Sequence, residues 1–268
     1  MPASPKTDKT ERKNKSAVPS VEKAIDIIEL LSLHPDGLTM NDIAEALDRT
    51  MGELYRIVVY MAERDYLQQD PATSKYALTL RLYELSHRFD PTERMLRNGI
   101  PLMESYAAKT DQSCHLGVLN RTNVLVLASV PSPRPAGYSV RTGAMFPVEQ
   151  TSTASVVMAF SAPADQARYL DRLKAEERAR AEQRLQAIQG AGFEQRQSTL
   201  VNGVNNLSVP VFDNRGVAAA LTSGYIEQPN QIASPEEALA LMRDMALNLS
   251  QSLGFQLDSS PYAGALVP

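Results

Sequence analysis

The side chains best suited to catalysis or metal binding do not form a recognisable site. The chain has one cysteine, Cys114, and three scattered histidines, His34, His87 and His115. This set does not make a Cys/His zinc site, although a site rich in carboxylates remains open. Cys114 and His115 are adjacent in an expected strand, where neighbouring side chains point to opposite faces, so they are poorly placed as nucleophile and base. No cofactor and no metal are expected.

Sequence motifs of common enzyme classes are also missing. The sequence contains no G-x-S-x-G, Walker A, H-E-x-x-H or G-x-G-x-x-G pattern. The carboxylates at 176, 177 and 182 fall in a polar stretch typical of a solvated helix face. Catalysis on a small molecule is therefore the weakest of the functions considered.

Cysteine usage and hydropathy indicate the compartment. A single cysteine excludes an intramolecular disulfide framework and fits a reducing cytoplasm. No apolar run approaches the roughly 18 residues needed to span a bilayer, and no secretory leader is recognisable. We expect a cytoplasmic protein without a membrane partner.

Basic side chains near two short predicted helices could contact DNA. Arg49 and Arg56 flank the helix expected at residues 51–61, and Lys75 lies in a hairpin expected at residues 66–78. Arginine can bind phosphate or the guanine edge, and lysine binds phosphate. The elements that would position these residues therefore decide whether they can act together.

Helical periodicity and capping patterns predict three helices between residues 20 and 63. Ser20 is the expected cap of the first helix, and Pro35-Asp36-Gly37 ends it. Thr39 with Asp42, and Thr50 with Glu53, form two capping boxes close together. Two capped helices joined by a tight turn indicate a helix-turn-helix, and the following hairpin makes it winged.

Charge argues against DNA binding by this segment. Residues 20–89 contain seven basic and twelve acidic residues, a net charge of −5, whereas DNA-binding domains usually have a basic footprint. Residues 1–19 add five basic and two acidic residues and have little to bury, which predicts a disordered arm. That arm is either a solubilising tail or a cationic arm that contacts phosphates. A winged-helix module that binds protein instead of DNA is therefore the second alternative.

The remaining residues predict a mixed domain of helices and strands. A helix is expected at 91–109 and strands at 114–119, 124–128 and 138–141. A helix opens at 151–155, a charged helix covers 164–189, and strands follow at 208–212 and 217–222. Ser234 and Pro235 begin a last helix with the typical cap and first-turn residues.

The order of these motifs resembles one known family. The runs S-x-E-K-A-I-x-I-I-E-L-L, G-L-T-x-x-D-I-A-E-A-L, L-Y-R-I-V, Y-L-x-x-D and K-Y-A-L succeed one another between residues 20 and 78. Together they resemble the N-terminal domain of the IclR family of bacterial transcription regulators, and a fainter likeness extends to about residue 253. The resemblance implies an α+β protein in which a winged helix-turn-helix at 20–79 and a linker helix at 80–90 precede a GAF-like α/β effector domain at 91–256. Residues 1–19 and 257–268 would be tails.

The resemblance implies a ligand-responsive regulator that binds double-stranded operator DNA. The expected DNA-binding residues are Arg49, Thr50, Met51, Gly52, Glu53, Tyr55, Arg56 and Lys75. Met51-Gly52-Glu53 departs from the Lys-Ser-Thr-like run of the family. Glu53 is either a helix cap or an acceptor for cytosine N4 in the major groove. Two recognition helices on a two-fold operator imply self-association, as a dimer or tetramer.

The resemblance also places an effector pocket in the C-terminal domain. The implied effector-binding residues are His115, Arg141, Ser152, Thr153, Arg196, Asn206, Thr222 and Gly224. Backbone N–H groups at Ser152 and Thr153 would suit an anion at a helix N-terminus. Either Arg141 or Arg196 would hold its carboxylate, and His115 is either a contact to a ring hydroxyl or a core histidine. The expected effector is a small organic acid, with aromatic acids among the candidates.

Overall fold

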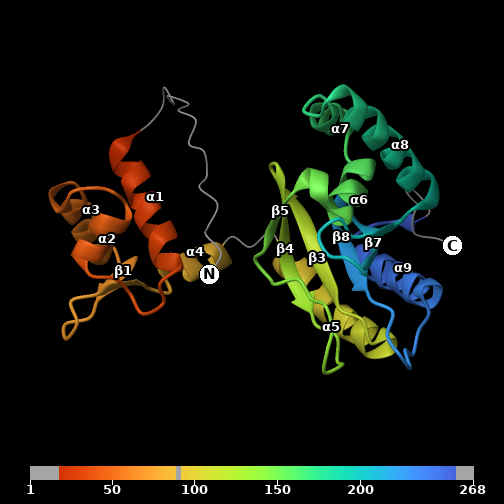
Figure 1. Cartoon of the computed structure of the whole chain (residues 1–268), viewed down its shortest axis with the longest axis horizontal. Helices are drawn as coiled ribbons and strands as arrows, with labels where there is room; N and C mark the ends of the chain where they lie inside the picture. The colour runs from red at the N-terminus through yellow and green to blue at the C-terminus, as the bar shows by residue number, and fades with distance from the viewer. Residues whose placement is uncertain (1–17, 89–91, 258–268) are drawn as a thin grey trace. The chain divides into compact units, whose positions relative to one another are not determined.

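Residues 18–88 and 92–257 are described by the computed structural model shown in Figure 1. The chain divides into one unit at Met1–Asp90 and a second at Pro91–Pro268. The predicted arm lies outside the described residues as far as residue 17, and so does nearly all of the predicted C-terminal tail. Among the residues described, no helix combines the length and the apolar character needed to cross a membrane.

The N-terminal unit is a three-helix bundle followed by a small hairpin. Its elements are α1 (Pro19–Ser32), α2 (Met40–Ala46), α3 (Met51–Glu63), β1 (Leu67–Gln69), β2 (Tyr76–Leu78) and α4 (Arg81–Arg88). The strands β1 and β2 pair antiparallel, as predicted. The buried core comes from all three helices and both strands, and its largest members are Ile27, Leu31, Ile43, Leu54, Val58, Met61, Leu67 and Tyr76.

Helix caps fix where α2 and α3 begin. The Asp42 backbone N–H donates to the Thr39 hydroxyl over 3.3 Å, and the Thr39 N–H donates to the Asp42 carboxylate over 3.0 Å, so the first capping box is confirmed. The Thr50 N–H likewise donates to Glu53 over 3.0 Å. Ser20 as the cap of α1 is wrong, because the helix already starts at Pro19, whose fixed φ suits the first helical position.

The C-terminal unit is built on one six-stranded antiparallel sheet with the order β5-β4-β3-β8-β7-β6. The strands are β3 (Cys114–Asn120), β4 (Asn123–Val130), β5 (Met145–Pro147), β6 (Glu194–Gln197), β7 (Asn205–Asp213) and β8 (Gly216–Tyr225). The helices are α5 (Glu93–Thr110), α6 (Ser152–Phe160), α7 (Pro163–Leu170), α8 (Ala175–Ala191) and α9 (Pro235–Ser252), with the short 3-10 turn η1 (Val148–Gln150) before α6.

Helices cover both faces of this sheet. The helices α5 and α9 pack together on one face, and α6 packs on β8, β7 and β3 from the other, with α7 and α8 outside it (Figure 1). All nine residues of α6 are buried, which suits a helix that is apolar around most of its circumference. The N-terminus of α6 therefore lies between the sheet and the outer helices.

Three expectations for this unit need correction. Residues 138–141 form no strand, and the edge strand is instead β5 at Met145–Pro147. The charged segment 164–189 is not one helix, because it breaks between α7 and α8. The strand β6 had no counterpart in the prediction, since its residues Glu-Gln-Arg-Gln have no alternation of apolar side chains.

Candidate functional site: an effector cavity and an exposed recognition helix

The register of three neighbouring strands places polar side chains in one row. His115 on β3 is opposite Thr222 on β8, and Thr222 is opposite Ser208 on β7. Directly opposed residues of antiparallel strands share a face of the sheet. One row further along, Asn206 is opposite Gly224. Both rows lie beneath α6.

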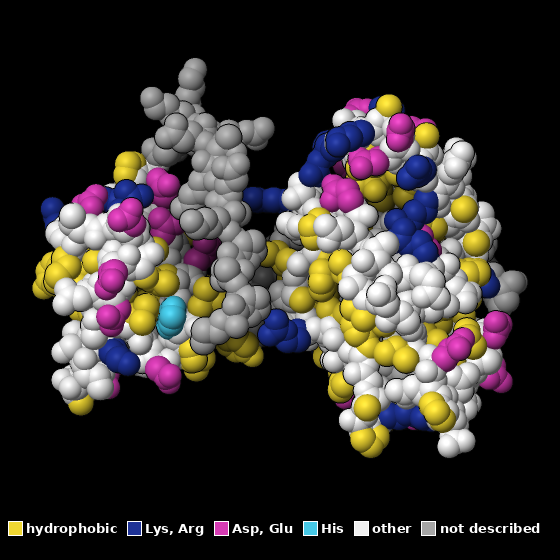
Figure 2. All heavy atoms as spheres, in the orientation of Figure 1, with side chains coloured by type: hydrophobic (Ala, Val, Ile, Leu, Met, Phe, Trp, Pro, Cys, Tyr) yellow, Lys and Arg dark blue, Asp and Glu magenta, His cyan; other side chains and the backbone are white. Residues whose placement is uncertain are grey.

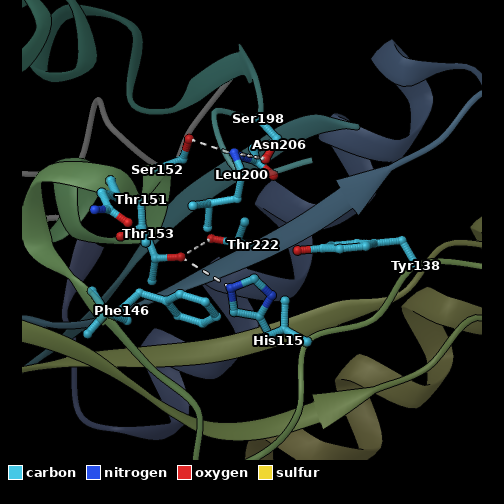
Figure 3. Close-up of a pocket in the computed structure, with 13 residues that line it drawn as sticks. His115, Tyr138, Phe146, Thr151, Ser152, Thr153, Ser198, Leu200, Asn206 and Thr222 are labelled. Atoms are coloured by element: carbon cyan, nitrogen blue, oxygen red, sulfur yellow. Dashed lines mark hydrogen bonds between the residues drawn. The ribbon is translucent and has the colours of Figure 1, made fainter. Parts of the chain in front are cut away.

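Helix α6 adds its own hydroxyl groups above these rows. The Thr153 hydroxyl lies 3.2 Å from Nε2 of His115 and 2.9 Å from the Thr222 hydroxyl, which in turn lies 2.9 Å from the Ser208 hydroxyl. These hydrogen bonds form a continuous chain of four side chains, which we call the hydroxyl chain. Figure 3 shows its first three members, His115, Thr153 and Thr222. Gly117 makes room for it, since a Cβ at that position would lie 2.7 Å from Cγ2 of Thr153.

His115 is uncharged in this setting. Burial lowers the pKa of its imidazole from 6.5 to about 4, because the charged form loses its hydration in the interior. At neutral pH, Nε2 therefore either donates one hydrogen bond to Thr153 or accepts one from it. His115 is half-buried, lines a cavity and bonds a side chain, so its contact to a ligand hydroxyl stays a prediction.

A cavity opens above the hydroxyl chain at the N-terminus of α6. Figure 3 shows side chains from α6, the sheet and the adjoining loops around it. The space that water-sized molecules can reach is about 30 Å³, enough for about two waters. The lining residues are His115, Val124, Tyr138, Val140, Phe146, Gln150, Thr151, Ser152, Thr153, Ser198, Leu200, Asn206 and Thr222. None of these is an acidic or basic residue apart from the neutral His115.

Five of the eight expected effector-binding residues come together here. They are His115, Ser152, Thr153, Asn206 and Thr222. Arg141 and Arg196, one of which was expected to hold the carboxylate, are not part of this lining. Arg141 is exposed on the loop before β5. Gly224 is not part of the lining either, because a side chain covers it.

The guanidinium of Arg196 does not line the cavity, although Arg196 is opposite Asn206 in the sheet. Burial lowers the pKa of its guanidinium, and the neighbouring Arg184 lowers it further. Arg184 is itself paired with the buried Glu194 carboxylate, at 2.5 and 2.7 Å. The charge of Arg196 therefore lies by this ion pair, on the side of the outer helices.

Several lining residues have no signal in the sequence. Tyr138 comes from the segment between β4 and β5, Phe146 comes from β5, and Ser198 and Leu200 come from the loop between β6 and β7. The second loop is fastened over the cavity by a hydrogen bond from the Thr199 hydroxyl to the backbone of residue 150, at 3.1 Å. No local pattern marks these positions, because they meet only through the sheet topology.

The outer surface of α3 presents the expected DNA-binding residues. Arg49, Thr50, Met51, Gly52, Glu53, Tyr55 and Arg56 are all exposed, and Lys75 in the wing is half-buried. In the described part of the chain, no hydrogen bond or ion pair holds the side chains of Arg49 and Arg56. These two guanidinium groups are therefore available to an external partner.

Glu53, by contrast, is already engaged within the unit. One carboxylate oxygen accepts from Lys23 on α1 at 3.0 Å, and the other accepts from the Thr50 backbone and hydroxyl, each at 3.0 Å. These bonds, the Thr50 backbone bond first, lower the pKa of Glu53 from 4.5 to about 2. The geometry favours the interpretation of Glu53 as a helix cap over that of a base-reading acceptor.

The acidic character of this unit is visible on its surface. In the face shown in Figure 2, Asp and Glu side chains are spread among hydrophobic ones, with few Lys or Arg. Among the residues expected to bind DNA, the basic ones are Arg49 and Arg56 at α3 and Lys75 in the wing.

Comparison with known proteins identifies the two units. The family model described as IclR helix-turn-helix domain matches residues 20–71, and the one described as Bacterial transcriptional regulator IclR C-terminal matches residues 94–251. The chain belongs to the IclR family. It is a transcription regulator with a helix-turn-helix domain for DNA and an effector-binding domain.

Members of the IclR family with curated names match along nearly their whole length. A glycerol operon regulatory protein of Streptomyces griseus is 26% identical over 247 residues, which cover 88% of this chain and 97% of the relative. The regulator KdgR of Escherichia coli is 24% identical over 257 residues, covering 91% and 95%. The expected family and its two-domain fold are thus confirmed.

Solved structures of IclR proteins share the fold. An IclR homologue of Microbacterium hydrocarbonoxydans complexed with 4-hydroxybenzoate superposes with a TM-score of 0.74 at 18% identity, covering 87% of this chain and 98% of that one. HmgR of Pseudomonas aeruginosa gives a TM-score of 0.69 at 23% identity, covering 89% and 100%. At these identities the likeness concerns the fold alone.

Proposed function

We propose that this IclR-family regulator senses a small organic acid in the cavity at the N-terminus of α6 and changes its operator binding in response. The observation that supports the proposal is the convergence of neutral donors on one buried helix end. Thr151 caps α6 by accepting from the Ala154 N–H at 3.1 Å, which leaves the N–H groups of Ser152 and Thr153 for another acceptor.

An anion can bind here without a cationic side chain. The first-turn N–H groups of a helix and its dipole together favour negative charge. The Ser152 hydroxyl accepts a long bond, 3.5 Å, from the Asn206 amide, so both groups can turn toward a carboxylate at little cost. Either oxygen of the acid would then be held by N–H, O–H and amide donors in place of the guanidinium expected from the sequence.

Aromatic acids are part of the proposal because apolar side chains form part of the wall. Val124, Val140, Phe146 and Leu200 line the cavity beside the polar row. The Microbacterium homologue was solved in complex with 4-hydroxybenzoate, which supports the inclusion of aromatic acids. An acid with a phenyl group would need more room than the cavity has in its present form.

Calorimetric titration of the full-length protein tests this function. The panel contains short aliphatic acids, benzoate, 4-hydroxybenzoate, and amines of matching size as controls. We expect heat from at least one acid and none from the amines, and the Thr153→Val variant should weaken that binding. Silence for every acid, or binding only of amines or uncharged compounds, would refute the proposal.

We further propose that the protein acts as a homo-oligomer, a dimer or tetramer, on double-stranded operator DNA in the cytoplasm. An apolar strip on α1 supports this, since Val18, Val21 and Ile25 are 58%, 54% and 49% exposed. We propose no catalytic activity, in keeping with relatives that are named as regulators. Light scattering of the wild type and of an Ile25→Glu variant would test the assembly, with a shift toward monomer expected for the variant.

A further inference from the structure

Tyr138 is the aromatic side chain that closes the effector cavity. It lies in the segment 131–144, between β4 and β5, which contains neither helix nor strand. Its ring is part of the cavity wall, and its hydroxyl points toward His115 and Thr222 (Figure 3). The cavity in its present form therefore has a phenol at its mouth.

Gly224 creates the place in which this ring lies. A Cβ at position 224 would be 2.5 Å from Cδ1 and 2.6 Å from Cε1 of Tyr138. These distances are far inside van der Waals contact, so the ring lies against the bare main chain of β8. The backbone of Gly224 does not have a positive φ. An alanine there would need no unusual φ, but its Cβ would displace the ring and press more lightly on Cγ1 of Val204, 3.3 Å away.

The Tyr138 hydroxyl forms no hydrogen bond with any residue that the structure describes. Burial raises the pKa of this phenol, so its O–H keeps its proton at any physiological pH. A donor that faces a polar cavity without an acceptor is available to a bound molecule.

We propose that Tyr138, held on Gly224, selects the effector by size and by hydrogen bonding. This inference rests on the proposed function of the cavity. The carboxylate binds at the N-terminus of α6, and Tyr138 donates its O–H to the hydroxy or oxo oxygen on the carbon next to the carboxylate. The preferred effector is a short hydroxy or oxo acid, because the cavity is narrow while the ring is in place and a short acid needs the least enlargement of it. An aromatic acid enters only when the ring leaves Gly224.

The test titrates full-length protein with pyruvate, lactate, propionate and 4-hydroxybenzoate. Propionate has the length of the first two acids but lacks the hydroxy or oxo oxygen next to the carboxylate. We expect pyruvate or lactate to bind more tightly than propionate. Tyr138→Phe keeps the ring and removes only the hydroxyl, so it should weaken the tighter acid about tenfold and leave propionate unchanged.

A double-mutant cycle tests the role of Gly224. Gly224→Ala should weaken the short acid in the wild type but have no further effect in a Tyr138→Ala background, because it acts through the ring. The Tyr138→Ala variant should also bind 4-hydroxybenzoate more tightly than the wild type does. Gly190→Ala is the matched control, since a Cβ there meets nothing within 4 Å. Thermal unfolding of each ligand-free variant shows whether the fold is kept.

Defined results would overturn the inference. Preference of the wild type for 4-hydroxybenzoate over both short acids would do so, as would short-acid binding that Tyr138→Phe leaves unchanged. Additive effects of Gly224→Ala and Tyr138→Ala would also count against it. In these cases acids still bind, so the proposed function stands. Absence of binding by every acid to every variant would instead refute the proposed function, and the inference with it.

Discussion

Acidification should destabilise the effector unit through His115. The pKa of this imidazole is lowered by burial from 6.5 to about 4 in the folded chain. At a pH between these two pKa values, His115 is protonated in the unfolded state but not in the folded state. The contribution of neutral His115 to stability is therefore complete above about pH 6.5 and is lost as the pH falls toward 4.

The size of the effect follows from the two pKa values. One pKa unit corresponds to about 1.4 kcal/mol, so the full window from 6.5 to about 4 amounts to roughly 3 kcal/mol. Between about pH 7 and pH 5 the loss is about 2 kcal/mol. For a unit of this size, with a urea dependence of about 2 kcal/mol per molar, the unfolding midpoint should fall by about 1 M.

Urea unfolding followed by circular dichroism at a series of pH values measures this loss. Carboxylates throughout the protein also respond to acid, so the informative quantity is the difference between the wild type and His115→Gln. The Gln amide nitrogen can take the place of Nε2 beside Thr153 without titrating. His34→Gln is the control, because His34 is an exposed histidine in the other unit.

The wild type should lose about 2 kcal/mol more than His115→Gln over this range, and His34→Gln should follow the wild type. Superimposed pH dependences for the wild type and His115→Gln would refute the reasoning. That outcome would mean that the imidazole is hydrated or paired in the folded chain. A midpoint that rises on acidification of the wild type alone would show that the sign is wrong.

Three further predictions concern other parts of the molecule. Gly117→Ala should displace Thr153, break the hydroxyl chain and cost about 1–3 kcal/mol in urea unfolding, and an unchanged midpoint would contradict the packing described. Arg56→Ala should weaken binding to the protein's own upstream DNA and lower the log–log salt slope by about one for each phosphate that is no longer neutralised. Arg121→Ala, in the exposed turn after β3, is the control and should change neither the affinity for DNA nor the salt slope. If Arg56→Ala reduces the affinity but leaves the slope unchanged, Arg56 contacts a base edge and not a phosphate. Glu53→Gln should lower stability slightly but leave the preference among operator sequences intact, as measured by competition with base-substituted operators, because its carboxylate is held by Lys23.

The N-terminal unit is predictable because its signals are local. Capping boxes, helical periodicity and the turn before β2 each depend on residues a few positions apart, and the fold follows them. The exception is the start of α1, where residue type favours Ser20 as the cap, while Pro19 and the cap at Val18 decide the boundary. Glu53 shows the limit of such reasoning, since its partner Lys23 is 30 residues away on another helix.

The cavity is only half predictable because it is assembled from distant segments. The residues inferred from the family resemblance fall on α6 and on the long strands, where position in the sheet fixes direction. Arg196 also keeps its place in the sheet, but Arg184 and Glu194 decide where its charge goes. The sequence predicts a strand at Tyr138, which instead lies on a loop over Gly224. This contact is possible because Gly224 has no side chain, and nothing in the sequence around Tyr138 indicates that the two residues meet.

The hydrogen bonds of the hydroxyl chain can run in either of two directions. Each of its oxygens can donate or accept, so the hydrogens can all run from His115 toward Ser208 or all run the other way. A carboxylate that accepts the Thr153 O–H leaves the Thr153 oxygen as an acceptor, so Thr222 then donates to Thr153 and Ser208 donates to Thr222. The occupied and empty cavities can therefore differ at Ser208, two strands away from His115, by the orientation of hydrogens alone. A signal of this kind would leave the heavy atoms in place, and neutron diffraction or hydroxyl-proton NMR would be needed to see it.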